Sequence, residues 1–301
     1  MKMCFLPHFF LLSMLCLNFG TQVVRSETLH SVISQNEAKR LFADANEKYQ
    51  QAAKLIAEKN IQESSQKLKE AARQYETILA GGFRHGQIYY NLANTYYRLN
   101  ELGKAVLNYR KAQRFMPRNT DIEANLKLVK NMTEDKELSN EPSVVIKRLF
   151  FWLFLLNQNE LIILTIAHYG ILMTLGFFLV ILKYSWLKKF VLGFAVCLFI
   201  VLVSLGVKIY KEQYTNNGII ITEKCQIRYG PGEEYEPKFE IHGGTECIIE
   251  DERDNWYKVY VNVGVKREPD QKMNISENVN KEIRSGWLKK ENVDVMNNKF
   301  L

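Results

Sequence analysis

The residues that most often do chemistry in proteins are few in this sequence, and they stand far apart. The five histidines are His8, His30, His85, His168 and His242. The cysteines and histidines do not follow the spacing of a zinc site. Gly230-Pro231-Gly232 falls in a predicted turn between strands, not in a loop that cradles phosphate before a helix. We therefore expect no catalytic centre, no metal and no cofactor, and a protein that is not an enzyme.

One pair of cysteines has the placement that a covalent link would need. Cys225 and Cys247 fall at inward positions of two predicted strands. An oxidising compartment would permit a disulfide between them. The alternative is a pair of buried thiols, because the sequence does not establish the geometry that a disulfide requires.

Charge excludes one class of function. The formal net charge is +7, but acidic and basic residues are mixed along both halves of the chain. Phosphate backbones need a basic face of a single sign. We expect no nucleic-acid binding.

The N-terminal segment 34–130 is expected to form a helical-repeat domain. Gly and Pro are rare there except at apparent turns, and apolar residues recur at helical spacing. In 86–119, small Ala93 and Ala105 allow two helices to approach closely, and Tyr109 fills the space between repeats. This unit resembles the 34-residue tetratricopeptide repeat (TPR).

A looser unit precedes this repeat. Tyr75 stands 34 residues before Tyr109, and Phe42 and Tyr49 belong to its first helix. Extra residues indicate an elongated helix pair that turns near 58–60. A further helix beyond Asn119 is expected to cover the open end of the stack.

The resemblance to TPR proteins implies a binding surface. Such stacks generally present the inner face of their first helices to a peptide or a partner protein. The positions that match this face are Gln87, Tyr90, Asn94, Tyr97 and Arg98. Asn and Arg suit the backbone or carboxylate of a partner, and tyrosines offer flat contact area. The alternative is that these side chains are solvated or cover a neighbouring helix.

Two uncharged segments are long enough to cross a membrane. At 1.5 Å per residue, 161–182 and 190–207 match a hydrocarbon core of about 30 Å. A polar linker, 131–148, leads to a shorter apolar segment, 149–156, which is expected to lie at the membrane interface.

Two features predict the orientation of this hairpin. Residues 1–26 have the pattern of a secretory signal peptide. The segment 183–189 contains three lysines and two aromatic residues, as a cytoplasmic loop does. Both outer ends of the hairpin are therefore expected on the exported side.

The C-terminal part consists of short predicted strands separated by turns. The segments 227–232, 256–259 and 286–287 resemble those of a bacterial SH3-like domain, a small β-barrel, over 218–295. A polar insertion, 262–284, separates two strands that are usually joined tightly.

The resemblance to SH3-like domains implies a second candidate groove, since such domains in exported bacterial proteins often bind cell-wall peptides or other proteins. The aromatic residues that suit it are Tyr229, Tyr235, Trp256 and Trp287. The alternative is that the two tryptophans pack in the core of the barrel.

The order of these elements, α-helical repeats followed by a membrane hairpin and a β domain, resembles the BatE family from aerotolerance gene clusters of Bacteroides-type bacteria and spirochaetes. The segment 88–99 and Gly103-Lys104-Ala105 give the closest local support. The resemblance implies a bacterial inner-membrane protein whose TPR and SH3-like domains face the periplasm. It also implies partners: membrane proteins with von Willebrand A domains and a MoxR-type ATPase.

We therefore expect a non-enzymatic scaffold that binds partner proteins and is linked to stress tolerance or envelope integrity. The alternative is a cell-wall-binding regulator that acts on peptidoglycan through its SH3-like domain.

Overall fold

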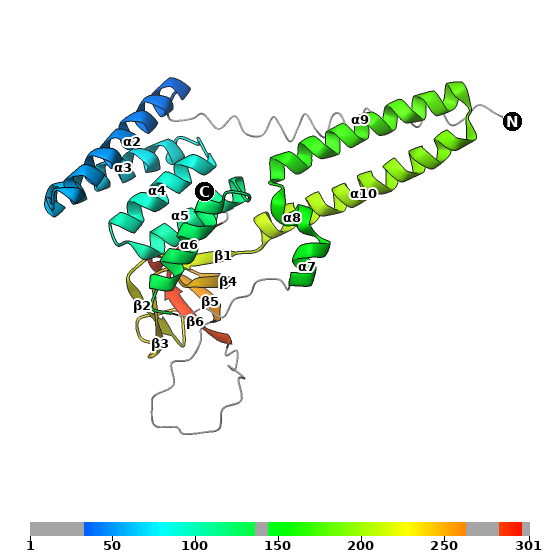
Figure 1. Cartoon of the computed structure of the whole chain (residues 1–301). Helices are drawn as coiled ribbons and strands as arrows, with labels where there is room; N and C mark the ends of the chain where they lie inside the picture. Colours follow the sequence, from blue (N-terminus) through cyan, green and yellow to red (C-terminus); the bar gives the residue numbers. More distant parts are fainter. Residues whose placement is uncertain (1–32, 136–143, 263–282, 297–301) are drawn as a thin grey trace.

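The computed structural model describes residues 33–135, 144–262 and 283–296. The predicted signal peptide, 1–26, and most of the insertion, 262–284, lie outside these residues. The described chain forms an N-terminal helical region, two long apolar helices and a seven-stranded antiparallel sheet (Figure 1). This confirms the predicted order of α-helical region, apolar helix pair and β region.

The helices of the N-terminal region pack in pairs, α2 with α3 and α4 with α5. Their bounds are α2 (Gln35–Ala57), α3 (Ile61–Ala80), α4 (Gly86–Arg98), α5 (Leu102–Phe115) and α6 (Thr120–Met132). The long first hairpin turns through Lys59, whose φ is 62°. The last helix starts at a side-chain cap, where Asn119 Oδ1 accepts from Ile122 N at 3.1 Å.

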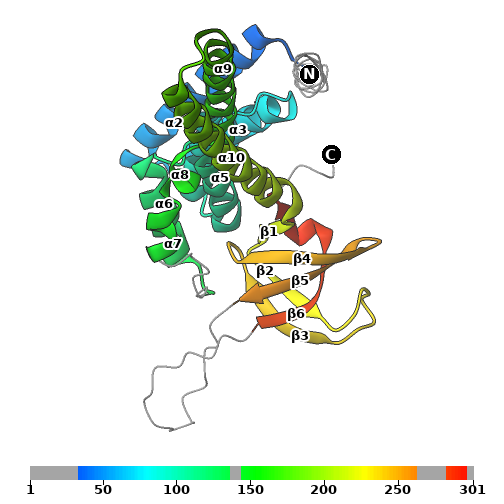
Figure 2. The same ribbon diagram turned by 90° about the vertical axis from the view of Figure 1, so that its right-hand side faces the viewer.

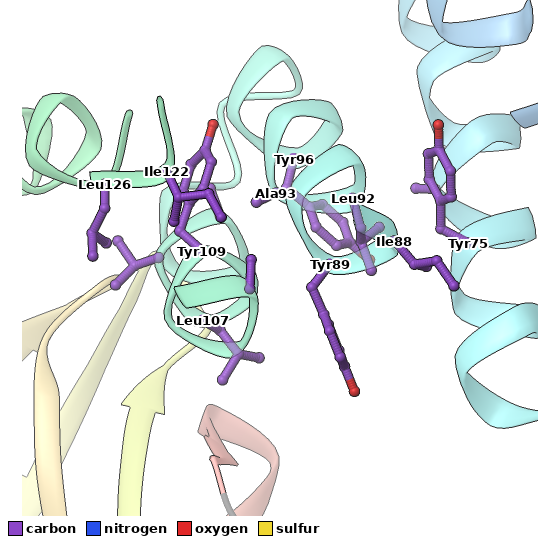
Figure 3. Packing of buried hydrophobic residues seen from close by; sticks show 14 of the residues in the cluster. Tyr75, Ile88, Tyr89, Leu92, Ala93, Tyr96, Leu107, Tyr109, Ile122 and Leu126 are labelled. Carbon is purple, nitrogen blue, oxygen red and sulfur yellow. The ribbon is translucent and has the colours of Figure 1, made fainter. Parts of the chain in front are cut away.

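Small and large side chains alternate in the core of this region. Ala93 and Ala105 have no exposed surface, and Tyr109 is 1% exposed. The alanines let the backbones of neighbouring helices approach, while the tyrosine fills the wider space beside them. The packing of α4 and α5 follows this rule (Figure 3).

The apolar helices α9 (Gln158–Leu182) and α10 (Ser185–Tyr214) form a hairpin that projects away from the rest of the molecule (Figure 1). Both are long and apolar enough to cross a membrane, and only 6% of each apolar window is buried. A core helix of a soluble domain would be mostly buried, so these two have the exposure expected of lipid-facing helices.

The helices of the hairpin are longer than the predicted spans. Only Lys183 and Tyr184 separate them, in place of the expected loop over 183–189, and α10 starts before the predicted 190–207. The remaining lysines continue the helix, because lysine is a good helix former and its long side chain reaches water from a helix end.

At its other end, α9 starts before the predicted residue 161. Asn157 and Glu160 form a capping box, in which Glu160 N donates to Asn157 Oδ1 at 2.9 Å and Asn157 N donates to Glu160 Oε2 at 2.8 Å. This pair satisfies two backbone donors and adds a turn to the helix.

The predicted interfacial segment, 149–156, is divided between α7 (Val144–Leu149) and α8 (Phe151–Leu155). The short α8 lies against α10, where Trp152 Nε1 donates to Ser204 Oγ at 3.0 Å. The apolar residues of α7 and α8 remain largely exposed, with Leu149 at 62%.

The sheet is antiparallel throughout, with the strand order β3-β2-β6-β5-β4-β1-β7. Its strands are β1 (Asn217–Ile220), β2 (Lys224–Arg228), β3 (Pro237–His242), β4 (Glu246–Arg253), β5 (Trp256–Asn262), β6 (Ile283–Lys289) and β7 (Val293–Val295). Asn262 pairs with Ile283, so β5 and β6 are hydrogen-bonded neighbours in the sheet although the insertion separates them along the chain. The pairing describes an open sheet, and its assignment to an SH3-like barrel remains a prediction.

The sheet packs on the helical region, with β1 against α5 (Figure 2). Ile219 belongs to the helical core and has no exposed surface. A Cβ added to Gly103 would lie 2.4 Å from Ile220 O, so only glycine permits this approach. The two regions therefore form one packed body from which the hairpin projects.

Candidate partner-binding groove

A polar hollow lies between α2 and α4 on the face that the TPR resemblance assigns to binding. It has a volume of about 370 Å³. Its lining residues are Phe42, Asn46, Tyr49, Gln50, Gln87, Asn91 and Asn94. None of these side chains is charged, so the hollow, which we call the amide groove, suits neutral hydrogen-bonding groups.

The five predicted contact residues divide into two sets. Gln87 and Asn94 line the amide groove. Arg98 stands at its rim, exposed, where its Nε donates to Tyr49 Oη at 2.7 Å. These three lie in or beside the groove, and their contact with a partner stays a prediction.

Tyr90 and Tyr97 are partly buried instead and pack against the helical core. Tyr90 lies beside Tyr109, with ring centroids 6.1 Å apart, and its hydroxyl accepts from Asn125 Nδ2 at 3.2 Å. For these two, the alternative of covering a neighbouring helix describes their position better than an open contact surface does.

The contribution of α2 to the groove was not predicted. Asn46 and Gln50 stand four residues apart on one helix face and supply one wall of the groove. The repeat pattern contained the signal, because Phe42 and Tyr49 already placed this segment as the first helix of a repeat.

Hydrogen bonds join the two walls. Gln87 Nε2 donates to Asn91 Oδ1 at 2.9 Å, and Asn91 Nδ2 donates to Asn46 Oδ1 at 2.8 Å. Tyr75 Oη donates to the same Asn46 oxygen at 2.6 Å. Burial raises the pKa of Tyr75 to about 12, so this hydroxyl keeps its proton and remains a donor at neutral pH.

The aromatic residues of the sheet do not form one open groove. Trp256 and Trp287 are 9% and 6% exposed, whereas Tyr229 and Tyr235 are 64% and 43% exposed. Lys238 Nζ lies 5.3 Å from the centre of the Tyr229 ring. The buried tryptophans fit the alternative of core packing, which leaves the two tyrosines as surface residues.

The possible disulfide between Cys225 and Cys247 is not formed in this structure, where Cys225 is a free thiol, as in the alternative of buried thiols. Cys225 on β2 and Cys247 on β4 are both buried in the core of the sheet. Burial raises the pKa of the Cys225 thiol to about 12. A protonated, enclosed thiol is a poor nucleophile.

We therefore expect Cys225 to resist alkylation while the sheet is folded. Maleimide at pH 8 should leave it unmodified in the native chain and modify it after denaturation, with the site read by peptide mass spectrometry. The control is the same chain treated with reductant before denaturation. Modification that needs reductant even after denaturation would show that Cys225 is in a disulfide.

Metal binding has no candidate in the described part of the chain, where no cluster of three or more His, Cys, Asp or Glu side chains could hold an ion.

Comparison with known proteins adds no identity: no protein-family model, curated protein or solved structure matches this chain significantly. The groove, the apolar hairpin and the docked sheet are therefore the basis for a functional proposal.

Proposed function

We propose that this protein is a non-enzymatic scaffold, anchored in a membrane by α9 and α10, whose amide groove binds an extended segment of a partner protein. The observation that supports this most is the groove itself. It contains amide and tyrosine side chains and no charged group. Side-chain amides match the donors and acceptors of a peptide backbone, which every extended segment exposes.

The contact between α5 and β1 supports one topology. Ile219 packs in the core of the helical region, yet it follows α10 in the chain. Two helices that cross a bilayer bring the chain back to its starting side, as this contact requires. With the predicted signal peptide and the lysines near the turn of the hairpin, this favours both regions on the exported face of a bacterial inner membrane.

The partner that we propose follows from the resemblance to the BatE family. The helical region would be a TPR module and the sheet an SH3-like module, and the protein would act in a complex with von Willebrand A membrane proteins and a MoxR-type ATPase. Peptidoglycan binding has less support, because two of its four proposed aromatic contacts are buried.

The triple variant Gln87→Ala, Asn94→Ala, Arg98→Ala tests this proposal. We expect it to abolish co-purification of a von Willebrand A membrane protein from native membranes, because three groove contacts are lost. The matched control is Gln66→Ala, Lys69→Ala, Arg73→Ala at exposed positions of α3, which line a separate hollow and not the amide groove. Equal recovery of the partner with both triple variants would refute groove binding.

A further inference from the structure

Two buried tyrosines lie directly behind the amide groove. Tyr75 and Tyr109 are each 1% exposed, and their hydroxyl groups lie on the same side of the helical stack, opposite to that of Tyr89 (Figure 3). Tyr75 Oη donates to Asn46 Oδ1 at 2.6 Å. Tyr109 Oη donates in the same way to Asn94 Oδ1. The same contact is thus made once on each wall of the groove.

Each of these amide oxygens accepts a second hydrogen bond. Asn91 Nδ2 donates to Asn46 Oδ1 at 2.8 Å, and Asn125 Nδ2 donates to Asn94 Oδ1 at 3.3 Å. A carbonyl oxygen has two lone pairs, so both oxygens are fully used within the protein. A flipped amide would place its N–H groups against the Nδ2 groups of Asn91 and Asn125, which opposes the reverse orientation. The tyrosine hydroxyls add a favourable contact to the orientation that these amides set.

The orientation of the oxygens decides what the groove offers a ligand. With Oδ1 of Asn46 and Asn94 turned to the interior, the Nδ2 groups are the polar atoms left to face the hollow that both residues line. Within the described part of the chain, neither Asn46 Nδ2 nor Asn94 Nδ2 donates a hydrogen bond. Both walls therefore present hydrogen-bond donors.

We infer that Tyr75 and Tyr109 are specificity-determining positioning residues that help to keep the Nδ2 donors of Asn46 and Asn94, one on each wall, turned to the groove. The groove then selects ligands by hydrogen-bond acceptors, namely the main-chain carbonyl oxygens of an extended peptide. Successive carbonyls on one side of such a peptide recur every two residues, about 6.6 to 6.8 Å apart. This inference rests on the proposed function and specifies that the groove donates hydrogen bonds and the bound peptide accepts them.

Asn94→Asp is the sharpest test, because it keeps an oxygen toward Tyr109 and Asn125 and replaces the groove-facing donor with a negatively charged acceptor. One carboxylate oxygen keeps the bonds from Tyr109 and Asn125, while the other replaces the Nδ2 donor with an acceptor. The probe is a set of 12-residue peptides, selected by phage display on the full chain in nanodiscs and retained only if Asn94→Ala weakens their binding without removing it at high peptide concentration. We expect Asn94→Asp to weaken these peptides by roughly 10- to 100-fold, with an unchanged melting temperature.

Tyr109→Phe tests the positioning role through a double-mutant cycle. Without the hydroxyl the Asn94 amide can invert, so we expect several-fold weaker binding in the wild-type background. In an Asn94→Ala background that retains measurable binding at high peptide concentration, the same change should have little further effect, because the amide that it orients is gone. A merely structural role would reduce affinity equally in both backgrounds.

The outcomes separate this inference from the proposed function. Failure to select any Asn94-dependent peptide would overturn peptide binding in the groove, and donor selection with it. Wild-type affinity of Asn94→Asp, or additivity in the cycle, would overturn donor selection alone. Peptides with free and amidated C-termini should bind equally, and a strict requirement for the free acid would show that a terminal carboxylate is the ligand, contradicting main-chain recognition.

Discussion

Glu246→Gln is expected to lower the free energy of unfolding by about 2 kcal/mol at pH 7. Glu246 on β4 lies between two cations of the helical region. Its Oε1 is 2.7 Å from Arg110 Nη2 on α5 and 2.7 Å from Lys130 Nζ on α6. Removing the carboxylate takes the shared negative charge from both cations. The value lies below that for a fully buried pair, because 32% of the Glu246 side chain is exposed.

The dependence of this effect on pH identifies its cause. Burial raises the pKa of Glu246, but Arg110 and Lys130 outweigh burial and hold this pKa below its ordinary value. A carboxyl whose pKa is lowered on folding stabilises the fold above its unfolded pKa, and this stabilisation is lost as pH falls through the lowered value. The difference between wild type and Glu246→Gln should therefore be complete near pH 7 and shrink below about pH 4.

Denaturant unfolding in mild detergent, followed by tryptophan fluorescence, measures this difference. The matched control is Glu240→Gln on β3, whose carboxylate is 42% exposed and 3.1 Å from the Lys224 ammonium. An exposed pair contributes between 0 and about 1 kcal/mol. Equal losses in the two variants would contradict a special role for Glu246 in joining sheet and helices.

The helices and most strands could be predicted because their signals are local. Apolar residues recur every three or four positions in the helical region, and Ala93 and Ala105 mark a close helix crossing. Strands β3 and β7 were missed. The first, Pro237–His242, alternates charged and apolar residues as a half-buried strand does, so its signal was present but was not used. The second has only three residues, too few to show an alternation.

The docking of the sheet on the helices had no such signal. Gly103 in α5 and Ile220 in β1 meet in space, but a membrane hairpin separates them along the chain. Glycine near a helix start reads as a turn residue, and its role as a contact point depends on tertiary structure. A single chain without covarying positions cannot show such a pair.

The candidate groove was predicted only in part for a related reason. Gln87 and Asn94 follow from the helix face that a repeat turns inward. Which atom of an amide faces a ligand depends on the hydrogen-bond partners behind the groove. Tyr75 and Tyr109 could not be predicted as such partners from the sequence, because their rings read as core residues. The prediction that these tyrosines pack in the core is confirmed, and the role proposed for their hydroxyl groups is additional to it.

Phe199→Arg is expected to make insertion of α10 less favourable by about 3 kcal/mol, because an arginine at the centre of a spanning helix carries a large transfer cost. Phe199 lies near the middle of the apolar window of α10 and is 66% exposed. If only α9 then crosses the bilayer, the sheet remains on the opposite side from the helical region. Ile219 could not then reach its place in the helical core, so this single substitution would prevent the sheet from packing on the helical region.

Protease added to the exported face of spheroplasts measures this outcome. In wild type it should reach both regions, whereas in Phe199→Arg it should reach the helical region and leave the sheet intact. Phe199→Leu keeps the apolar surface, and Tyr184→Arg adds the same charge at the turn of the hairpin, where water is close. Both controls should behave as wild type. Exported-face access to the sheet in Phe199→Arg would mean that α10 need not cross the membrane, and contact between α5 and β1 would no longer support a spanning hairpin.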